Sequence, residues 1–565
     1  MGVALCKFAV YSHESCLLAV LILRILRGYL RPPMCFVYNL NVNRTRDRES
    51  FLLIRSLHLA VIVCLLTCFP LAKVCQAQTE EKTAKYLESV RHQPGLLLAF
   101  LQAMPKGGDL HVHLYGAVYA ESMIDWASES ALCVDRSTSK LMHAACDSCE
   151  SYNNKPSVRC AYQDQILYDQ LVDAWSMRNW HPAEESGHDH FFATFEKFGP
   201  AMEKHVGDAL AEVAARAAAD HLQYVEVMHT ADGAQAAILG TKIGWDDDFG
   251  KFRDKLLADG MADVVASVRS QLDSDEARKK EVLHCGTAQA GAGCEVTIRY
   301  LYQVLRGLPR EQVFAQILLG FELSKADPRF VGFNLVMPED YYVPMHDFDL
   351  HMRIIEALHK FYPATHVSLH AGELAMGLVP PEGLRFHIRE SIERGGAERI
   401  GHGVDVMSED DPIGLLREMA RKNVLVEICL TSNDVILGVS GDRHPLPVYM
   451  KYGVPVALAT DDEGVSRGDM THEYLRAVET YDLSYADLKR MTRESLEHSF
   501  ISGDSLWSDG RELRRTGGCA DSDMEPKIDS LKFVSEKCQQ YLKASERARV
   551  QWQLEKAFAV FENKF

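Results

Sequence analysis

Short apolar runs alternate with longer stretches of helical periodicity from residue 105 to about residue 500. Short runs rich in apolar and β-branched residues, bounded by polar or glycine positions, are typical of buried parallel strands. We expect strands over 109–114, 223–229, 295–301, 330–336, 366–370, 399–403, 424–429 and 455–460. We expect helices over 161–178, 190–219, 301–307, 311–325, 349–360, 381–394, 411–421 and 472–480. Eight βα units predict an α/β protein, a (β/α)8 TIM barrel with helical and cysteine-bearing insertions, whose active site lies at the carboxyl ends of the strands.

The pattern divides the chain into four parts. They are a leader (1–77), an N-terminal helical segment (78–104), the barrel (105–500, with an insert at 131–190) and a C-terminal helical extension (501–565). Within the extension, a stretch rich in Gly, Asp and Ser precedes a helix expected over 526–562 and broken near residue 544.

Charge separates the leader from the rest. The chain has 61 Lys+Arg and 79 Asp+Glu, a formal net charge of −18. The first 78 residues hold nine basic and three acidic side chains, a net +6, so the remainder carries −24. Phosphate-backbone affinity depends on Lys and Arg, so this acidic body argues against a nucleic-acid partner.

The leader contains a candidate secretory signal. Arg55 precedes the apolar run 59–69, which is followed by Pro70 and by Cys75-Gln-Ala77, a small-x-small pattern suited to signal peptidase. The run is shorter than the roughly 20 apolar residues of a transmembrane helix. We therefore expect translation to start downstream, at Met34, with cleavage after Ala77 and a secreted or periplasmic product without stable membrane insertion. The alternative is a leader retained as a membrane anchor.

Cysteine spacing supports export. Outside the leader, eight cysteines fall into three even groups: Cys133, Cys146, Cys149 and Cys160; Cys285 and Cys294; Cys519 and Cys538. Even groups in polar loops indicate local disulfides in an oxidising compartment. A zinc knuckle is the alternative for the first group, which contains one CxxC pair. Cys429, within an apolar run, is expected to be an inert core thiol.

Side chains of the kinds that ligate metals (His, Asp and Glu) lie at the carboxyl ends of four of the expected strands. These strand ends read Asp109-Leu-His111-Val-His113, Leu369-His370-Ala-Gly-Glu373, Gly401-His402-Gly403 and Thr460-Asp461-Asp462. Residues i and i+2 of a strand face the same side, so both histidines of the first motif can point into one barrel mouth.

Each motif alone has a structural alternative. His370 could be a core histidine, and the Asp461-Asp462 pair could cap the next helix. A second HxH, His188-Asp-His190, lies in an expected loop and follows no strand. Four motifs at the carboxyl ends of four expected strands together predict a metal centre.

The same segments resemble a known family. They are Met104-Pro-Lys-Gly-Gly-Asp-Leu-His-Val-His-Leu-Tyr-Gly-Ala117, Ser368-Leu-His-Ala-Gly-Glu373, Arg399-Ile-Gly-His-Gly-Val404, Glu427-Ile-Cys-Leu-Thr-Ser-Asn433 and Leu458-Ala-Thr-Asp-Asp462. Over roughly residues 100–500 the chain resembles the adenosine deaminase family of the amidohydrolase superfamily, and within it an exported subgroup.

The resemblance implies one Zn²⁺ per chain. His111, His113, His370 and Asp461 match the family's zinc ligands, and imidazoles with a carboxylate suit zinc with one position open for water. Binuclear relatives carry a bridging lysine at the end of the fourth strand. The corresponding stretch 330–337 contains no Lys, which favours a single metal.

The resemblance also implies roles for four residues around the purine. Glu373 matches the general acid that protonates N1, and His402 matches the group that orients or deprotonates the attacking water. Asp462 matches the acceptor for protonated N7. Met337 occupies the place of a Gly whose backbone N–H donates to N3, and its side chain is expected to narrow the pocket.

Other departures concern the sugar and the lid. Tyr115 stands where many members have an Asp that reaches the ribose, and the insert enlarges the catalytic face. The aromatic residues Phe191, Phe192, Phe195 and Phe198 lie where the family's lid helix covers the substrate. Their helical spacing is equally compatible with side chains that only pack in the hydrophobic core.

The resemblance implies hydrolytic deamination of adenosine and 2′-deoxyadenosine, with water as co-substrate and ammonia released. One alternative is a deaminase of another 6-aminopurine, such as adenine, an adenine nucleotide or a modified adenosine. Another is an extracellular growth-factor-like protein that has kept the fold without catalysis. Loss of a zinc ligand would have favoured the latter, and none is lost.

Overall fold

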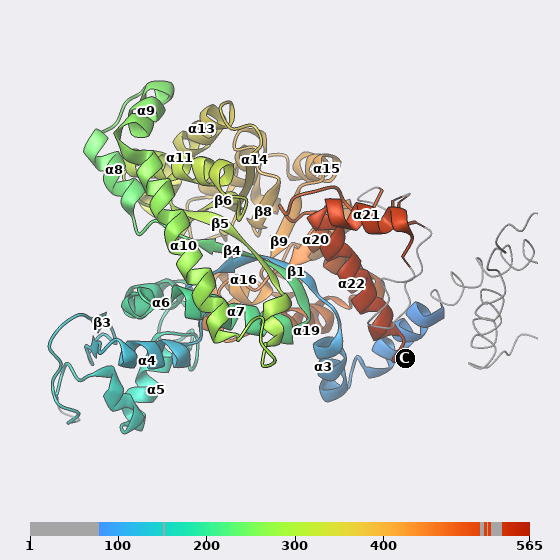
Figure 1. The fold of residues 1–565 in the computed structure, drawn as a ribbon, viewed down its shortest axis with the longest axis horizontal. Coiled ribbons are helices and arrows are strands. Elements are labelled where there is room, and N and C mark those ends of the chain that lie inside the picture. The colour runs from blue at the N-terminus through green and yellow to red at the C-terminus, as the bar shows by residue number, and fades with distance from the viewer. Residues whose placement is uncertain (1–77, 151–152, 509–512, 517, 521–533) are drawn as a thin grey trace, which may run out of the picture. The chain divides into compact units, whose positions relative to one another are not determined.

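A computed structural model describes residues 78–150, 153–508, 513–516, 518–520 and 534–565 (Figure 1). The expected signal, the start at Met34, the cleavage after Ala77 and the first part of the 526–562 helix lie outside these residues. These described residues form one compact unit. Within the described ranges, no helix combines the length and the apolar character needed to cross a membrane.

Eight parallel strands form the nearly closed barrel that the sequence predicts. They are β1 (Gly107–His113), β4 (Leu222–His229), β5 (Thr297–Leu305), β6 (Phe330–Val336), β7 (His366–Ala371), β8 (Arg399–His402), β9 (Leu425–Ile428) and β10 (Val456–Leu458). They are paired in the order β1-β4-β5-β6-β7-β8-β9-β10. The two end strands approach each other through the backbone: His113 N donates to Asp461 O at 3.1 Å, and Asp461 N donates to His111 O at 2.9 Å.

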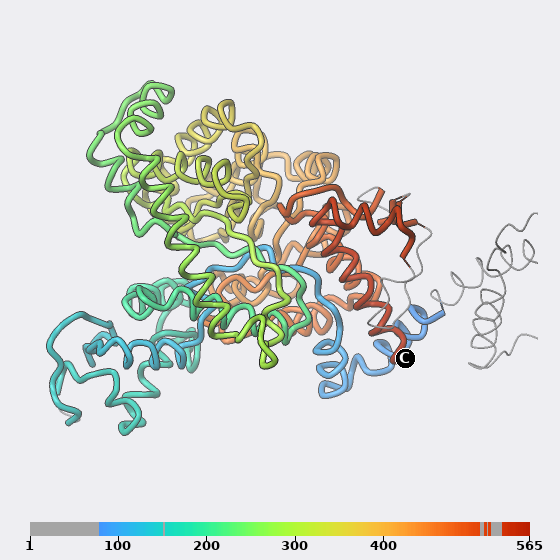
Figure 2. The backbone as a smooth tube through the Cα atoms, viewed as in Figure 1, coloured from blue at the N-terminus to red at the C-terminus, as the bar shows by residue number. Residues whose placement is uncertain are grey.

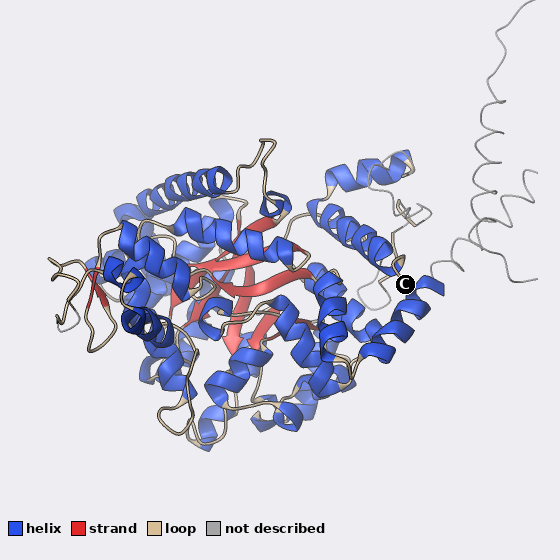
Figure 3. Ribbon diagram, turned by 90° about the horizontal axis from the view of Figure 1, so that it is seen from below, coloured by secondary structure: helices blue, strands red, loops and turns tan. Residues whose placement is uncertain are grey.

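Helices surround the strands (Figure 3). Besides the helical residues 78–90, those up to β6 are α3 (Pro94–Ala103), α4 (Ala120–Glu129), α5 (Gln165–Ala174), α6 (Gly187–Met202), α7 (Val206–Ala219), α8 (Gln235–Ile243), α9 (Phe249–Leu256), α10 (Ala262–Val282) and α11 (Arg310–Ala326). Those after β6 are α12 (Tyr342–His346), α13 (Phe348–His359), α14 (His387–Glu393), α15 (Pro412–Lys422), α16 (Leu430–Leu437), α17 (Leu446–Tyr452), α18 (Glu463–Ser466), α19 (Met470–Tyr481), α20 (Tyr485–Glu497), α21 (Glu536–Ala544) and α22 (Glu546–Glu562).

The segment between β4 and β6 differs from the predicted elements. The helix expected over 301–307 is wrong, because β5 continues to Leu305 and pairs with β6 up to Leu305↔Val336. Tyr302 and Val304 are buried, so the alternation of a strand persists there. The helix expected over 190–219 is two helices, α6 and α7, and α8 to α10 were not predicted.

The prediction of local disulfides is confirmed. The pairs are Cys133–Cys146, Cys149–Cys160, Cys285–Cys294 and Cys519–Cys538. Cys429 is buried and free, as expected. The first two disulfides lie in the insert, which also contains a small antiparallel pair, β2 (Cys133–Val134) and β3 (Leu141–Met142). The zinc-knuckle alternative for this group is therefore wrong.

The two ends of the described chain pack together (Figure 2). The rings of Phe100 in α3 and Phe561 in α22 have centroids 5.1 Å apart. The expected break near residue 544 is confirmed at Ser545, whose side chain accepts from Ala548 N and caps α22. The C-terminal extension thus packs against the segment that enters the barrel.

Candidate active site

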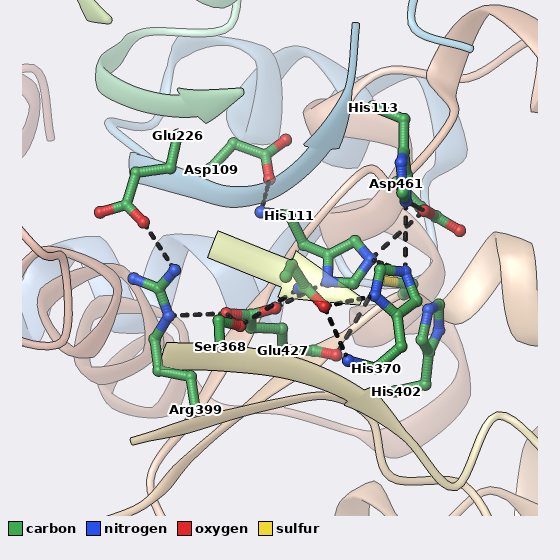
Figure 4. Close-up of polar contacts among 12 residues, drawn as sticks. Asp109, His111, His113, Glu226, Ser368, His370, Arg399, His402, Glu427 and Asp461 are labelled. Carbon is green, nitrogen blue, oxygen red and sulfur yellow. Dashed lines mark hydrogen bonds and ion pairs between the residues drawn. The ribbon is translucent and has the colours of Figure 1, made fainter. Parts of the chain in front are cut away.

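Four side chains converge at the carboxyl end of the barrel (Figure 4). His111 and His113 come from β1, His370 from β7, and Asp461 follows β10. The Nε2 atom of His370 lies 3.0 Å from Nε2 of His111 and 3.2 Å from Nε2 of His113. Asp461 Oδ1 lies 3.4 Å from His111 Nε2 and 3.3 Å from His113 Nε2. The structure therefore brings together the four residues that the sequence assigns to the metal.

The opposite nitrogen of each imidazole contacts an oxygen acceptor. His111 Nδ1 lies 2.6 Å from Glu427 Oε2, His113 Nδ1 lies 2.9 Å from Gln303 Oε1, and His370 Nδ1 lies 2.9 Å from Asn334 Oδ1. An acceptor at Nδ1 places the ring proton there and leaves a lone pair on Nε2. Three lone pairs and a carboxylate oxygen facing one another match the donor set of a divalent cation such as zinc.

A buried charge network supports Glu427. Its Oε1 accepts from Ser368 Oγ at 3.0 Å and lies 2.7 Å from Arg399 Nε, and Arg399 also pairs with Glu226 at 2.6 Å. Burial alone would raise the pKa of Glu427, but the charge of Arg399 and the bond from His111 lower it below its ordinary value. An ionised Glu427 holds the His111 ring in its ligating orientation.

Sequence reasoning missed these supporting residues. Gln303, Asn334 and Glu427 lie within β5, β6 and β9. The sequence feature that could have indicated them is a polar residue inside an otherwise apolar strand of a barrel. That signal identifies an interior-facing side chain but not the histidine it contacts.

Replacing Gln303 with Leu should weaken binding of a divalent cation, measured with zinc, by roughly 10–100-fold, because His113 loses the acceptor that fixes its tautomer. Gln303→Glu keeps an acceptor oxygen at this position, so its metal affinity should stay close to that of the parent. Competition with a chromophoric chelator measures both affinities. Equal affinities for the Leu variant and the parent would contradict the orienting role.

Glu373 and His402 flank the four residues. Glu373 lies in the turn after β7, and its Oε1 is 3.7 Å from His402 Nε2. Burial and the neighbouring Asp461 raise the pKa of Glu373, which favours the protonated acid. Burial lowers the pKa of His402 to about 3, so the ring is uncharged at neutral pH. The amide of Asn433 contacts His402 Nδ1 at 3.0 Å and fixes the ring.

Asp462 lies beside Asp461, with a buried Oδ1 that has no hydrogen-bond partner among the described residues. It is the residue before α18, but its side chain makes no capping hydrogen bond, so helix capping does not explain it. A Cβ at Gly116 would lie 1.6 Å from Asp462 Oδ1, so only glycine fits there. Burial raises the pKa of Asp462 to about 8.

A cavity of about 490 Å³ opens above these residues and is lined by His113, His370, Glu373, His402, Asp461 and Asp462. Three residues of the aromatic run, Phe191, Phe192 and Phe195, also line it, whereas Phe198 is fully buried in the core. The run therefore serves as both cavity wall and core.

Met337 and Tyr115 belong to the same cavity wall. Met337 has a φ of 92°, a conformation that favours glycine. Its Sδ lies 3.3 Å from Gly307 N, so part of the side chain packs against Gly307.

The second HxH pair lies elsewhere. His188 and His190 belong to α6, not to a loop as expected, because Ser186 caps the helix through Asp189 N. His188 Nε2 contacts Asp340 Oδ1 at 2.9 Å, and His190 Nδ1 contacts Glu185 Oε2 at 2.9 Å. Neither histidine lines the cavity.

Fold and site together define a (β/α)8 barrel with a candidate metal centre at the carboxyl ends of its strands. The sequence profile described as Adenosine deaminase matches residues 160–507. The chain belongs to the adenosine deaminase family, in which hydrolytic deaminases are typical. His111 and His113 precede the matched segment.

Curated relatives match parts of the chain. An adenosine deaminase of Clostridium perfringens is 34% identical over 137 residues, 24% of this chain and 38% of that protein. An adenosine deaminase of Mycobacterium marinum is 29% identical over 226 residues, 38% of this chain and 58% of that protein. The chain thus spans less than two thirds of the length of these relatives.

Solved structures are similar at lower identity. An adenine deaminase from Arthrobacter aurescens has a TM-score of 0.46 and 17% identity, covering 70% of this chain and 94% of that one. An N6-methyl-AMP deaminase from Arabidopsis thaliana has a TM-score of 0.45 and 19% identity, covering 72% and 94%.

Proposed function

We propose that the protein is a zinc-dependent hydrolase that converts adenosine and 2′-deoxyadenosine into inosine and 2′-deoxyinosine and releases ammonia. The observation that carries this proposal is the convergence of three imidazole Nε2 atoms and Asp461 beside Glu373 and His402 in one cavity. Membership of the family supports it.

The proposed zinc ligands are His111, His113, His370 and Asp461. Zinc bound there would supply the acidification of water, to a pKa of about 7, that makes hydroxide available at neutral pH. Glu427, Gln303 and Asn334 hold the three histidines with their Nε2 lone pairs free.

The surrounding residues act on the purine and the water. Glu373 donates a proton to N1, which makes C6 electrophilic, and His402 orients the attacking water. Asp462, whose Oδ1 has no hydrogen-bond partner within the described ranges and whose raised pKa favours the protonated carboxyl, donates a hydrogen bond to N7, which carries a lone pair in adenosine. The backbone N–H of Met337 donates to N3. Of the two protons of the water, one returns to Glu373 and the other passes to the exocyclic amine, so that collapse of the tetrahedral carbon breaks the C6–N bond and releases ammonia.

The charge of the cavity favours a nucleoside over a nucleotide. Its lining includes the acidic residues Glu196 and Asp461 but, among the described residues, no Lys or Arg. A phosphate group needs cationic or N–H donors and is repelled by carboxylates. Tyr115 in the cavity wall can contact an uncharged sugar. We therefore propose adenosine, and not AMP, as the preferred substrate.

A substrate panel tests this assignment. We expect zinc-loaded, disulfide-intact protein to convert adenosine and 2′-deoxyadenosine with kcat/KM at least about 100-fold above AMP, a difference of about 2.7 kcal/mol. Adenine and N6-methyl-AMP complete the panel, and ultraviolet absorbance follows the conversion. A preference for AMP or adenine would assign that compound as the substrate in place of adenosine. If no member of the panel were converted, the proposal of an enzyme would be rejected in favour of a growth-factor-like protein.

We also propose that the protein is exported. Four local disulfides support an oxidising compartment, as does the signal pattern in the leader.

A further inference from the structure

The turn that carries Glu373 is held by a buried carboxylate. Glu339, which follows β6, is 1% exposed. Its Oε1 accepts from Gly372 N at 3.1 Å, and its Oε2 accepts from Glu373 N at 2.8 Å. Each oxygen thus serves one N–H of the turn, and no other side chain accepts from either group among the described residues.

The opposite side of the turn is held by backbone groups. Gly403 N donates to Ala371 O at 3.1 Å, and Val404 N donates to Gly372 O at 2.8 Å. Gly372 has a φ of 75°, and a Cβ there would lie 2.4 Å from Asp405 Oδ1. The carbonyl groups of the turn thus accept from the β8 loop, whereas the N–H groups of Gly372 and Glu373 donate to Glu339.

A buried arginine joins the same region. Arg306, which follows β5 and is fully buried, donates to His370 O at 3.2 Å and to Met337 O at 3.3 Å. Its charge interacts favourably with Glu339. Arg306 and Glu339 thus connect the ends of β5, β6 and β7 behind the cavity.

We propose that Glu339 is a positioning residue that sets the carboxyl of Glu373 against the reacting purine by anchoring both N–H groups of its turn. The inference rests on the proposed function for the role of Glu373 and goes beyond it in naming what fixes that residue. Glu339 does not line the cavity, so it acts through the turn and not on the substrate. Its effect should therefore fall on kcat more than on KM.

Glu339→Gln tests the anchor. An amide has one acceptor oxygen and cannot replace two that each hold a separate N–H. A displacement of about 1 Å at a reacting group costs about 100-fold in rate, so we expect kcat to fall by about that factor. KM should stay within about threefold and zinc content should be unchanged, because no metal ligand is altered.

Glu409→Gln is a matched control. Glu409 is also buried, at 4% exposure, and also accepts two backbone N–H groups, from Ile388 and Arg389. Both bonds end on Oε1, and Oε2 has no hydrogen-bond partner among the described residues, so glutamine can keep both bonds. We expect this variant to keep kcat within about threefold of the parent.

Crystal structures of both variants give a readout that does not depend on turnover. The Glu373 carboxyl should be displaced in Glu339→Gln and unmoved in Glu409→Gln. An unchanged kcat, or an unmoved Glu373, in Glu339→Gln would overturn the inference. If that variant does not fold, Glu339→Asp replaces it, since its shorter side chain cannot reach both N–H groups, and an unchanged kcat there would also overturn the inference.

The outcome is separable from that of the proposed function. A parent enzyme that deaminates no 6-aminopurine rejects the function, whereas the crystallographic comparison still decides whether Glu339 positions the turn.

Discussion

Replacing Glu373 with Gln should lower kcat for adenosine by roughly 10²–10⁴-fold, the usual contribution of a general acid. Glutamine has nearly the same shape but no proton to deliver to N1. The four candidate ligands are untouched, so zinc content should equal that of the parent. Steady-state kinetics with metal analysis on the same preparation checks both expectations.

Glu382→Gln provides the control for this prediction. Glu382 lies in the same connection between β7 and α14 but is exposed. It should behave as the parent in rate and zinc content. Retention of most activity by Glu373→Gln would show that another group supplies the proton, and loss of zinc would show that Glu373 supports the metal centre instead.

Replacing His113 with Ala should abolish both zinc binding and turnover. The loss of one of four ligands leaves an incomplete donor set, and the remaining lone pairs of His111 and His370 do not hold a metal with comparable affinity. Because the His113 side chain is 14% exposed and not central to the core, the folded state should survive. Zinc titration by calorimetry and circular dichroism measure the two properties.

The second HxH pair supplies the matched control. The His190 side chain is 15% exposed, nearly the same as that of His113, but it contacts Glu185 and lies outside the cavity. His190→Ala should keep full zinc content and activity. Equal zinc loss in both variants would mean that the effect is one of stability and not of ligation.

The strands were predictable because each is a short apolar run between polar boundaries, and their carboxyl ends then place the metal-type residues. His111 and His113 follow from the period of two in a strand, and His370 and Asp461 follow from the parallel order of the barrel. The end of β5 was mispredicted because its alternation continues past residue 301 through Tyr302 and Val304.

Contacts that join distant segments could not be predicted from local pattern. Glu427 lies 316 residues from His111, and Glu339 meets the backbone of a turn 34 residues away. Pairing of this kind is set by barrel closure and by backbone N–H groups, which have no sequence signature. The supporting residues therefore became visible only with the fold.

The proposed zinc-dependent hydrolysis is tested most directly by tracing the oxygen of water into the product. Protein stripped of metal and reloaded with zinc should convert adenosine in oxygen-labelled water to inosine, with one ammonia released per inosine and the label at C6. The stripped protein should be inactive. Failure of the zinc-loaded protein to turn over adenosine, or inosine formed without label from water, would contradict the assignment as a zinc-dependent hydrolytic deaminase.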